Sequence, residues 1–335
     1  MPWPDGAWRT ALAEAFTEPA ELLQALGLDP SSLGDRRAAD EAARRFAVRV
    51  PRGYVARMRR GDPTDPLLAQ VLPVGREIER VPGFSTDPVG ERPIAEAGVL
   101  RKYRGRALLV TTGACAVHCR YCFRRHFPYD EASVPAAGWE DAVAAIAGDP
   151  AIEEVILSGG DPLALADRPL ARVFDAIGAI GHVERLRIHT RLPVVLPERV
   201  DRQLLSILAS VSRPLVVVLH VNHAREVDDH VRTAVGGLRA CGATLLNQAV
   251  LLRGVNDSVE ALHELGTALV DAGVVPYYLH LLDRVDGAAH FDVPEEVGRR
   301  LVGELAARAS GYLVPRLVRE EVGRPAKVVV PPIMP

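Results

Sequence analysis

The sequence predicts an α/β fold built mainly from parallel strands. From residue 107 onward, short apolar runs alternate six times with stretches of helical periodicity. Strands separated by helices in this way are joined by right-handed crossovers, which make the strands parallel. The chain has 335 residues, of which 48% are hydrophobic, so it can bury a sizeable core. A doubly wound sheet and a barrel share this pattern, and periodicity alone does not separate them.

The elements can be placed by residue number. The predicted strands are the apolar runs 107–112, 154–158, 185–190, 215–221, 244–252 and 275–282. The predicted helices between them are 139–147, 170–180, 200–211, 228–240 and 259–272. Before residue 95 the pattern predicts amphipathic helices over 8–26 and 40–50, followed by loops rich in proline and glycine at 61–66 and 81–88.

Composition narrows the class of protein. The net charge of −3 arises from mixed signs rather than from blocks, which disfavours a nucleic-acid-binding tail or a membrane-binding patch. We find no run of 18 apolar residues, so no transmembrane helix is expected. The first residues lack the basic start and apolar core of a secretory signal, and we therefore expect a protein of the reducing cytoplasm.

Three of the four cysteines lie within eight residues, directly after the first predicted strand. Cys115, Cys119 and Cys122 have the spacing C-x3-C-x2-C. Such close spacing brings three sulfurs around one centre, as a metal or iron–sulfur site requires. Most clusters and closed zinc sites take four protein ligands, so three thiols indicate a site with one open position. Zinc held by these thiols with His118 or Cys241 is an alternative, and a chance grouping of small buried residues is another.

Other polar residues follow the ends of the predicted strands. In parallel α/β folds, ligands collect at the carboxyl ends of the strands. The segment Ser158, Gly159, Gly160, Asp161 ends the second strand, the fourth strand runs into His220, and Asp283 follows the sixth. We therefore expect these residues to face the same site as the cysteines. A tight turn is the alternative interpretation of the glycine segment.

Lysine is almost absent from this chain. Of 40 basic residues, only Lys102 and Lys327 are lysine. A lysine ammonium can lose its proton and form a Schiff base, whereas an arginine guanidinium cannot. Lys327, which follows a turn near the end of the chain, is thus a candidate for covalent chemistry. Lys102 is the rival candidate, and an ordinary exposed lysine is the alternative interpretation.

Taken together, these motifs resemble those of the radical S-adenosylmethionine (SAM) enzymes, and within them the lysine 2,3-aminomutase family. The cysteine trio, followed by Phe123, Arg124 and Arg125, resembles the motif that binds a [4Fe-4S] cluster. The resemblance spans nearly the whole chain. It implies a partial (β/α)6 barrel over 96–312, an N-terminal helical extension over 1–95 and a short C-terminal segment over 313–335 that binds pyridoxal phosphate (PLP).

The resemblance also implies roles for individual residues. Lys327 lies where the family carries the lysine that binds PLP, and Tyr103 and Arg106, just before the first predicted strand, would help to hold this cofactor. The segment from Ser158 to Asp161 would let the backbone approach the methionine part of SAM, because glycine permits close contact. His220 and Gln248 match positions that line the SAM and PLP pocket.

Substrate recognition follows from the same comparison and from charge. Lysine carries a carboxylate at one end and an ammonium at the other, so its site needs a cation and anions. Arg124 matches the family position that binds the carboxylate. Asp283 and Glu320 match the two positions that bind the ε-ammonium, although the best-known members have aspartate at the second.

The predicted function is therefore an isomerase that converts L-lysine to β-lysine. Only eight residues follow Lys327, and this short end resembles the branch that makes (R)-β-lysine for modification of elongation factor P. The expected partners are L-lysine, a flavodoxin- or ferredoxin-type electron donor and, functionally, elongation factor P and its lysyl ligase, with no nucleic acid or membrane. The alternatives are the same machinery acting on another basic amino acid, a radical SAM enzyme without PLP, and a zinc-stabilised binding protein.

Overall fold

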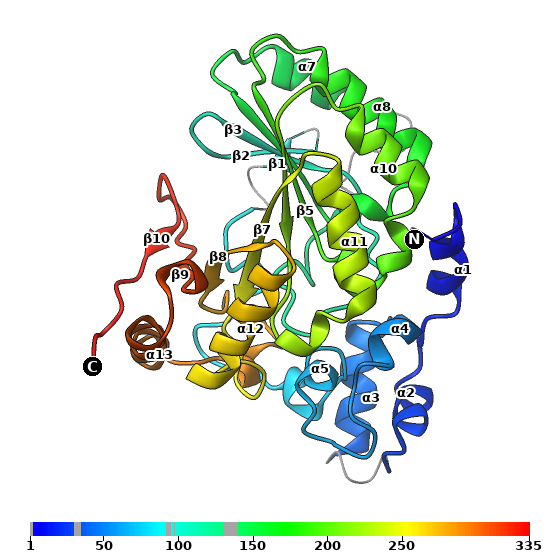
Figure 1. The fold of residues 1–335 in the computed structure, drawn as a ribbon. Coiled ribbons are helices and arrows are strands. Elements are labelled where there is room, and N and C mark those ends of the chain that lie inside the picture. The colour runs from blue at the N-terminus through cyan, green and yellow to red at the C-terminus, as the bar shows by residue number, and fades with distance from the viewer. Residues whose placement is uncertain (1–2, 30–34, 92–94, 97, 130–139) are drawn as a thin grey trace.

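The fold is known from a computed structural model that describes residues 3–29, 35–91, 95–96, 98–129 and 140–335. In these residues one ten-stranded sheet follows the order of the chain from β1 to β10 (Figure 1). Strands β3 to β9 are parallel, while β1, β2 and β10 add antiparallel edges. The strands are β1 (Ala95–Glu96), β2 (Val99–Tyr103), β3 (Arg106–Val110), β4 (Glu154–Ser158), β5 (Arg185–Thr190), β6 (Leu215–Leu219), β7 (Thr244–Val250), β8 (Val275–His280), β9 (Arg316–Arg319) and β10 (Val328–Val329).

Helices connect the parallel strands and cover one face of the sheet (Figure 1). The longer ones are α7 (Glu140–Ala147), α8 (Asp167–Gly178), α10 (Arg202–Ala209), α11 (Asp229–Ala240), α12 (Val259–Asp271) and α13 (Glu295–Arg308). Asp201, Asp228 and Ser258 cap α10, α11 and α12 by accepting hydrogen bonds from backbone N–H groups, which fixes where these helices start. The six predicted strands correspond to β3–β8, and the sheet stays open between β1 and β10. The predicted α/β fold with a partial barrel is confirmed.

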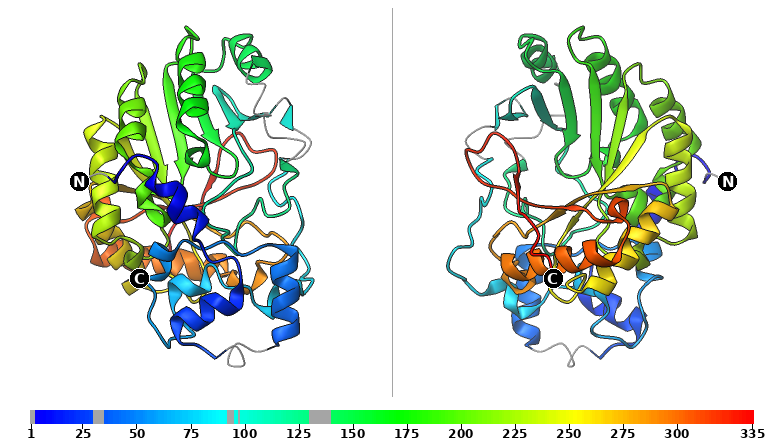
Figure 2. Two further views of the ribbon diagram at one scale, coloured as in Figure 1. Left: turned by 90° about the vertical axis from the view of Figure 1, so that its right-hand side faces the viewer. Right: turned by 60° about the vertical axis from the view of Figure 1, so that its left-hand side comes forward.

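The N-terminal region contains short helices that lie at the carboxyl ends of the strands (Figures 1 and 2). The prediction of one helix over 8–26 is wrong: α1 (Ala7–Ala13) and α2 (Pro19–Leu26) are separate, because Phe16 between them pairs with Val50 in an isolated bridge and Pro19 starts α2 as its first residue. The predicted helix over 40–50 is α3 (Arg36–Arg45), which stops before Val50 pairs with Phe16 in an isolated bridge. Further on are α4 (Arg52–Val55), α5 (Pro66–Ala69) and the 3-10 turn η2 (Gly75–Ile78).

The edges of the sheet were not foreseen. Tyr103 and Arg106 do not precede the first strand but end β2 and begin β3, where they pair across a hairpin that turns at Gly105 with φ of 74°. At the other edge, β9 and β10 extend the sheet beyond β8, and Lys327 directly precedes β10. The edge strands β1, β9 and β10 have only two to four residues, and runs this short carry too little periodicity to be found from sequence.

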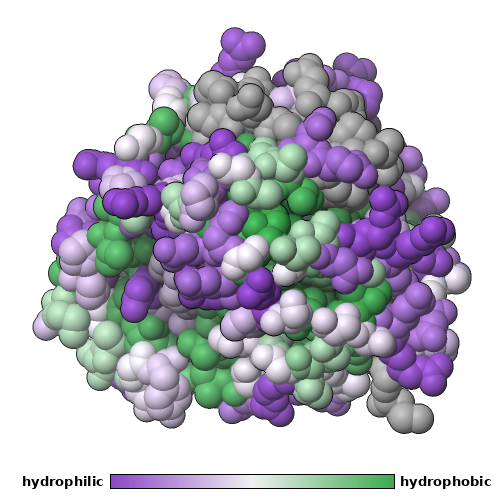
Figure 3. Space-filling model, turned by 90° about the horizontal axis from the view of Figure 1, so that it is seen from above, coloured by the Kyte–Doolittle hydropathy of each residue, from purple (hydrophilic) through white to green (hydrophobic). Residues whose placement is uncertain are grey.

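The core lies between the sheet and its helices. β4 is buried along its whole length, whereas burial alternates along β5, as expected for strands at different depths of a packed sheet. On the face seen from above, hydrophilic side chains surround small groups of hydrophobic ones (Figure 3). Among the described residues, none of the helices is long and apolar enough to cross a membrane.

Candidate active site

The three clustered cysteines lie in the loop after β3, on the wall of a cavity of about 490 Å³. Burial raises the pKa of Cys122 to about 11, and the neighbouring Cys119 adds to this effect. Burial also raises the pKa of Cys115 well above its ordinary value. Packing thiols together in a buried place disfavours their thiolate forms, and bound metal would offset this cost. Cys241, by contrast, ends α11, donates a hydrogen bond to the Leu205 carbonyl, and does not line this cavity.

The cysteine loop is held by the N-terminal region. Arg120 and Glu77 form a buried ion pair with Nη2 to Oε2 at 2.6 Å, and both side chains are 0% exposed. Arg125 binds the same carboxylate at 2.8 Å. The His118 N–H donates to the Arg49 carbonyl at 3.0 Å. These contacts fix the residues between the cysteines, so the N-terminal region positions the thiols.

The glycine segment after β4 packs against the cysteine loop. Gly159 has φ of +122°, and a Cβ atom there would come within 2.6 Å of the Thr112 carbonyl oxygen. A Cβ atom on Gly160 would come within 2.3 Å of the Ala114 carbonyl oxygen. Both glycines are therefore needed for close contact between the two loops. The structure thus gives these glycines a packing role beside the predicted contact with SAM.

Asp161 joins the loops after β4 and β5. Its buried carboxylate accepts hydrogen bonds from Thr190 Oγ1 and from the backbone N–H groups of Leu163, Arg191 and Leu192, at 2.7 to 3.1 Å. A carboxylate with this many donors is fully satisfied. Asp161 therefore fixes the loops after β4 and β5 relative to each other.

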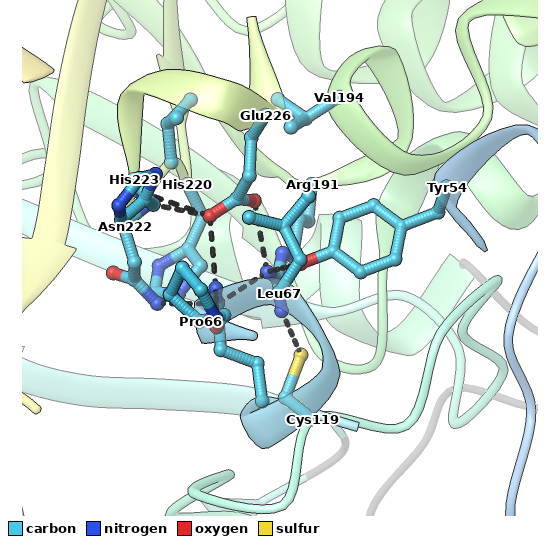
Figure 4. Close-up of polar contacts among 12 residues, drawn as sticks. Tyr54, Pro66, Leu67, Cys119, Arg191, Val194, His220, Asn222, His223 and Glu226 are labelled. Atoms are coloured by element: carbon cyan, nitrogen blue, oxygen red, sulfur yellow. Dashed lines mark hydrogen bonds and ion pairs between the residues drawn. The ribbon is translucent and has the colours of Figure 1, made fainter. Parts of the chain in front are cut away.

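His220 lies in a buried polar network at the end of β6. Its Nε2 is 2.8 Å from the Tyr121 hydroxyl, and the two rings stack with centroids 5.6 Å apart. Burial, aided by Arg191, lowers the pKa of His220 to about 3, so the imidazole is neutral. Arg191 belongs to the same network and donates to Cys119 (Figure 4).

Lys327 and Glu320 meet at another part of the wall of the same cavity. Lys327 Nζ is 2.5 Å from Glu320 Oε2, and Lys102 Nζ is 2.8 Å from Glu320 Oε1. The Tyr103 hydroxyl also donates to Glu320. Burial works to raise the pKa of Glu320, but Lys327, Lys102 and Tyr103 together hold it below its ordinary value. Both lysines of the chain therefore share one carboxylate.

Asp283 lies in the same part of the cavity. Burial raises its pKa to about 6, while the nearby Lys327 ammonium works in the opposite direction. Glu320 adds to the rise. Two carboxylates and two ammonium groups thus share this wall, so a further ammonium would find an unbalanced negative charge here once Lys327 had given up its own positive charge.

Arg124 forms an ion pair with Glu91. Its Nε and Nη2 bind both oxygens of Glu91, at 2.7 and 3.0 Å. Its Nη1 donates to Ser158 Oγ at 3.1 Å and to the Gly159 carbonyl at 3.3 Å. Glu91 gives no signal in the sequence, because it follows a loop with no recognisable motif. A substrate carboxylate at Arg124 would have to share or replace Glu91.

Arg106 and Gln248 complete the set of predicted residues. The Arg106 guanidinium stacks on the Tyr103 ring, with Cζ 4.9 Å from the centroid, and makes no side-chain hydrogen bond to the part of the chain that the structure describes. Gln248, on β7, lines the cavity. Arg106 is therefore available to bind an anion.

Several buried polar atoms at the cavity have no partner within the described residues. They are His189 Nε2, His280 Nε2 and Arg191 Nε. An unsatisfied buried polar group costs about 1–3 kcal/mol, so a ligand that supplied partners would be favoured. The two histidines, His189 and His280, lie on strands β5 and β8. The sequence analysis missed both, although a polar residue within an apolar run is a signal that could have found them.

The cavity brings together every residue that the sequence analysis selected except Cys241. Among the described residues, no three His, Cys, Asp or Glu side chains are placed to hold a single metal ion. An iron–sulfur cluster is bound at separate iron atoms, so its thiolates need not meet at one point. Three thiols and a half-buried lysine line one cavity, and residues of these types could hold a cluster and a carbonyl cofactor.

Comparison with known proteins agrees with this arrangement. The model of the radical SAM superfamily matches residues 109–265, which include the three cysteines. The chain is 48% identical over 321 residues to L-lysine 2,3-aminomutase of Escherichia coli (strain K12), covering 96% of this chain and 93% of that protein. It is 44% identical to the Haemophilus influenzae enzyme of the same name over 96% of this chain and 95% of that protein. With the Clostridium subterminale enzyme it is 35% identical over 84% of this chain and 67% of that protein.

The chain therefore belongs to the radical SAM family of L-lysine 2,3-aminomutases. Membership implies three cofactors: a [4Fe-4S] cluster, SAM and PLP. The residues present fit them, since the cavity offers a thiol trio, a lysine and an arginine without a hydrogen-bonded partner among the described residues. The unsatisfied imidazoles supply further polar groups for a ligand.

Proposed function

We propose that this chain is an isomerase that converts L-lysine to β-lysine. One observation carries the proposal: the cysteine trio and Lys327 line the same cavity, and Asp283 and Glu320 lie at its Lys327 end. This shared cavity would let radical chemistry at the cysteines reach an amino acid held near Lys327. The identity of 40–48% to enzymes named L-lysine 2,3-aminomutase supports the reaction class.

The cofactors would be held by separate groups of residues. Cys115, Cys119 and Cys122 would bind the cluster, and Lys327 would bind PLP, with its phosphate at Arg106 and its ring beside Tyr103. Ser158, Gly159, Gly160, Asp161, His220 and Gln248 would line the SAM and PLP pocket. When bound, the cluster and SAM supply a hydrogen-abstracting radical, and PLP carries the amino group that moves from C2 to C3.

The protein orients the substrate by charge. Asp283 and Glu320 would bind the ε-ammonium of the substrate. Lys327 would leave the Glu320 carboxylate when its own nitrogen binds PLP. Arg124 would bind the substrate carboxylate together with, or in place of, Glu91. Charged hydrogen bonds contribute about 1.5–3 kcal/mol each, so two carboxylates at one end favour lysine over an amino acid with a neutral side chain.

The product and its use follow from the branch that the sequence resembles. We propose (R)-β-lysine, made for the modification of elongation factor P through its lysyl ligase, with electrons from a flavodoxin- or ferredoxin-type donor. The division 1–95, 96–312 and 313–335 is proposed as an organisation into a clamp for the cysteine loop, a barrel and a PLP-binding segment.

An anaerobic reaction tests this proposal. Reconstituted protein is mixed with SAM, PLP, a reductant and L-lysine, and the products are separated by chiral chromatography with mass detection. The proposal predicts (R)-β-lysine from lysine, and no β-amino acid from arginine or ornithine in a parallel panel. Formation of (S)-β-lysine would overturn the elongation factor P role. Cleavage of SAM without change to lysine would overturn the substrate.

A further inference from the structure

Arg191 connects a predicted cluster ligand to three residues far away in the sequence (Figure 4). Its Nη1 donates to Cys119 Sγ at 2.7 Å. On the other side, its Nη2 lies 3.0 Å from Glu226 Oε2, 2.7 Å from Gln70 Oε1 and 3.2 Å from the Tyr54 hydroxyl. The guanidinium therefore lies between a sulfur atom and a group of fixed acceptors.

The position of Arg191 is set by its surroundings. Its backbone N–H donates to Asp161 at 2.7 Å, and its side chain is 7% exposed. Glu226 is itself 0% exposed and accepts the backbone N–H groups of Asn222 and His223. Because both partners are buried and hydrogen-bonded, the guanidinium cannot turn away from Cys119 without leaving a buried charge unpaired.

The hydrogen bonds from arginine side chains differ among the three cysteines. Arg49 approaches Cys115, but it donates to the backbone carbonyl at 3.3 Å rather than to the sulfur. For the residues that the structure describes, Cys119 is the one cysteine of the trio whose sulfur accepts a guanidinium hydrogen bond. With Glu226 on its far side, the Arg191 cation forms a dipole whose positive end faces this sulfur.

Hydrogen bonds to ligating sulfurs, together with local charge, tune the reduction potential of an iron–sulfur cluster. A donor to the sulfur stabilises the reduced cluster, which carries one more negative charge, and so raises the potential. We propose that Arg191 is a positioning residue that raises the reduction potential of the cluster through its hydrogen bond to Cys119. This inference rests on the proposed function, since it requires that Cys119 binds a cluster.

The inference also gives a purpose to the N-terminal region. Tyr54 and Gln70 belong to that region, and they hold the side of the guanidinium that faces away from the sulfur. Gln70 also accepts hydrogen bonds from Tyr121 and Asn222, and its backbone carbonyl accepts the Arg120 N–H. Through this network, the position of the N-terminal helices helps to fix the guanidinium that donates to Cys119.

A redox titration followed by electron paramagnetic resonance tests the proposal. The double variant Arg191→Met/Glu226→Gln removes the donor without leaving a buried charge. We expect its potential to be lower, so that at a fixed poise the ratio of reduced to oxidised cluster falls about tenfold, equivalent to about 59 mV for one electron. Tyr54→Phe, which removes only the longest contact on the far side of the same guanidinium, at 3.2 Å, serves as the matched control and should shift the potential much less.

A second variant covers the case in which the double variant does not fold. Arg191→Lys keeps the charge, but one ammonium lacks the fork that bridges Cys119 and Glu226; its potential should lie below that of the wild type. An unchanged potential in either cluster-loaded variant would overturn the inference, as would an equal shift in Tyr54→Phe. Failure of the wild-type chain to take up iron and sulfide would instead overturn the proposed function on which the inference rests.

Discussion

The two walls of the cavity are built in opposite ways. The cysteine wall is locked by buried ion pairs, with the Arg120 and Glu77 side chains both 0% exposed. The wall around Lys327 is formed by short edge strands, and the Lys327 side chain is 26% exposed. One wall therefore resists movement, whereas the other leaves its central lysine accessible.

This difference matches what each wall has to do. A cluster ligand must keep its place through many turnovers, and rigid support from surrounding contacts serves that purpose. A lysine that is to bind a cofactor covalently must be able to exchange its partner, and Lys327 has only to leave the Glu320 carboxylate. The comparison predicts that variants of the cysteine wall affect stability and cluster content, and variants of the lysine wall affect turnover.

The largest effect is expected from Lys327→Ala. It should abolish turnover, by roughly 10³-fold or more as for loss of a catalytic group, because the proposal assigns the Schiff base to Lys327 and not to Lys102, which shares the Glu320 carboxylate. The absorption spectrum of the cluster should stay unchanged. Lys327→Arg, which keeps a cation beside Glu320 but cannot form a Schiff base, should be equally inactive. Full activity in either variant would contradict the assignment.

The next effect concerns Glu77, which pairs with both Arg120 and Arg125. Glu77→Gln leaves two buried guanidinium groups without their counter-charge and should lower the free energy of unfolding by about 3–5 kcal/mol. Denaturant unfolding measures this change, and iron analysis should show less cluster. Glu79→Gln, two residues away and exposed, is the control and should shift stability by less than about 0.5 kcal/mol. Equal effects would remove the distinction between the walls.

Much of this organisation could be predicted from sequence. Apolar periodicity located the parallel strands β3 to β8, and the cysteine spacing pointed to the cysteine wall, because both are local signals. The pairing of Arg124 with Glu91 and of Arg120 with Glu77 depends on contacts between distant segments, which no local pattern reveals. The short strands β2 and β10 are stabilised by pairing with neighbours rather than by their own periodicity. The scarcity of lysine was the one compositional signal that pointed to the second wall.

Asp283 should make substrate binding depend on pH. Burial raises the folded-state pKa of Asp283 to about 6, above its ordinary value. The charges of Glu320 and Glu91 add to this rise, whereas those of Lys327 and Lys102 oppose it. The protonated form is thus favoured in the folded state, and the stability it contributes at low pH is lost as pH rises through about 6. The carboxylate needed for an ammonium disappears below this pH.

The measurement is kcat/KM for lysine against pH, which reports groups of the free enzyme. We expect kcat/KM to fall about tenfold for each pH unit well below 6. The variant Asp283→Asn should have a low kcat/KM at all pH values, and this value should not show the fall below pH 6. A wild-type profile that stays flat between pH 7 and pH 5 would show that Asp283 does not bind the substrate ammonium.

A smaller effect is expected from the glycines of the cysteine wall. Gly160→Ala would force a Cβ atom to within 2.3 Å of the Ala114 carbonyl and should cost about 1–3 kcal/mol, as for overpacking. Gly236→Ala, in α11 with open space at its Cβ position, should stabilise the chain by about 0.5–1 kcal/mol. Thermal unfolding of the pair decides the point: a loss in Gly236→Ala as large as in Gly160→Ala would mean that the contact has no special role.

The central claim is that the two walls serve one reaction. It is tested most directly by incubating the reconstituted wild-type protein anaerobically with SAM, PLP, a reductant and lysine deuterated at C3. Mass analysis then measures deuterium in the 5′-deoxyadenosine recovered after quenching. The account predicts transfer of deuterium from lysine to 5′-deoxyadenosine, because the proposal places the substrate lysine between Lys327 and the cysteine wall. Formation of 5′-deoxyadenosine free of deuterium would contradict it.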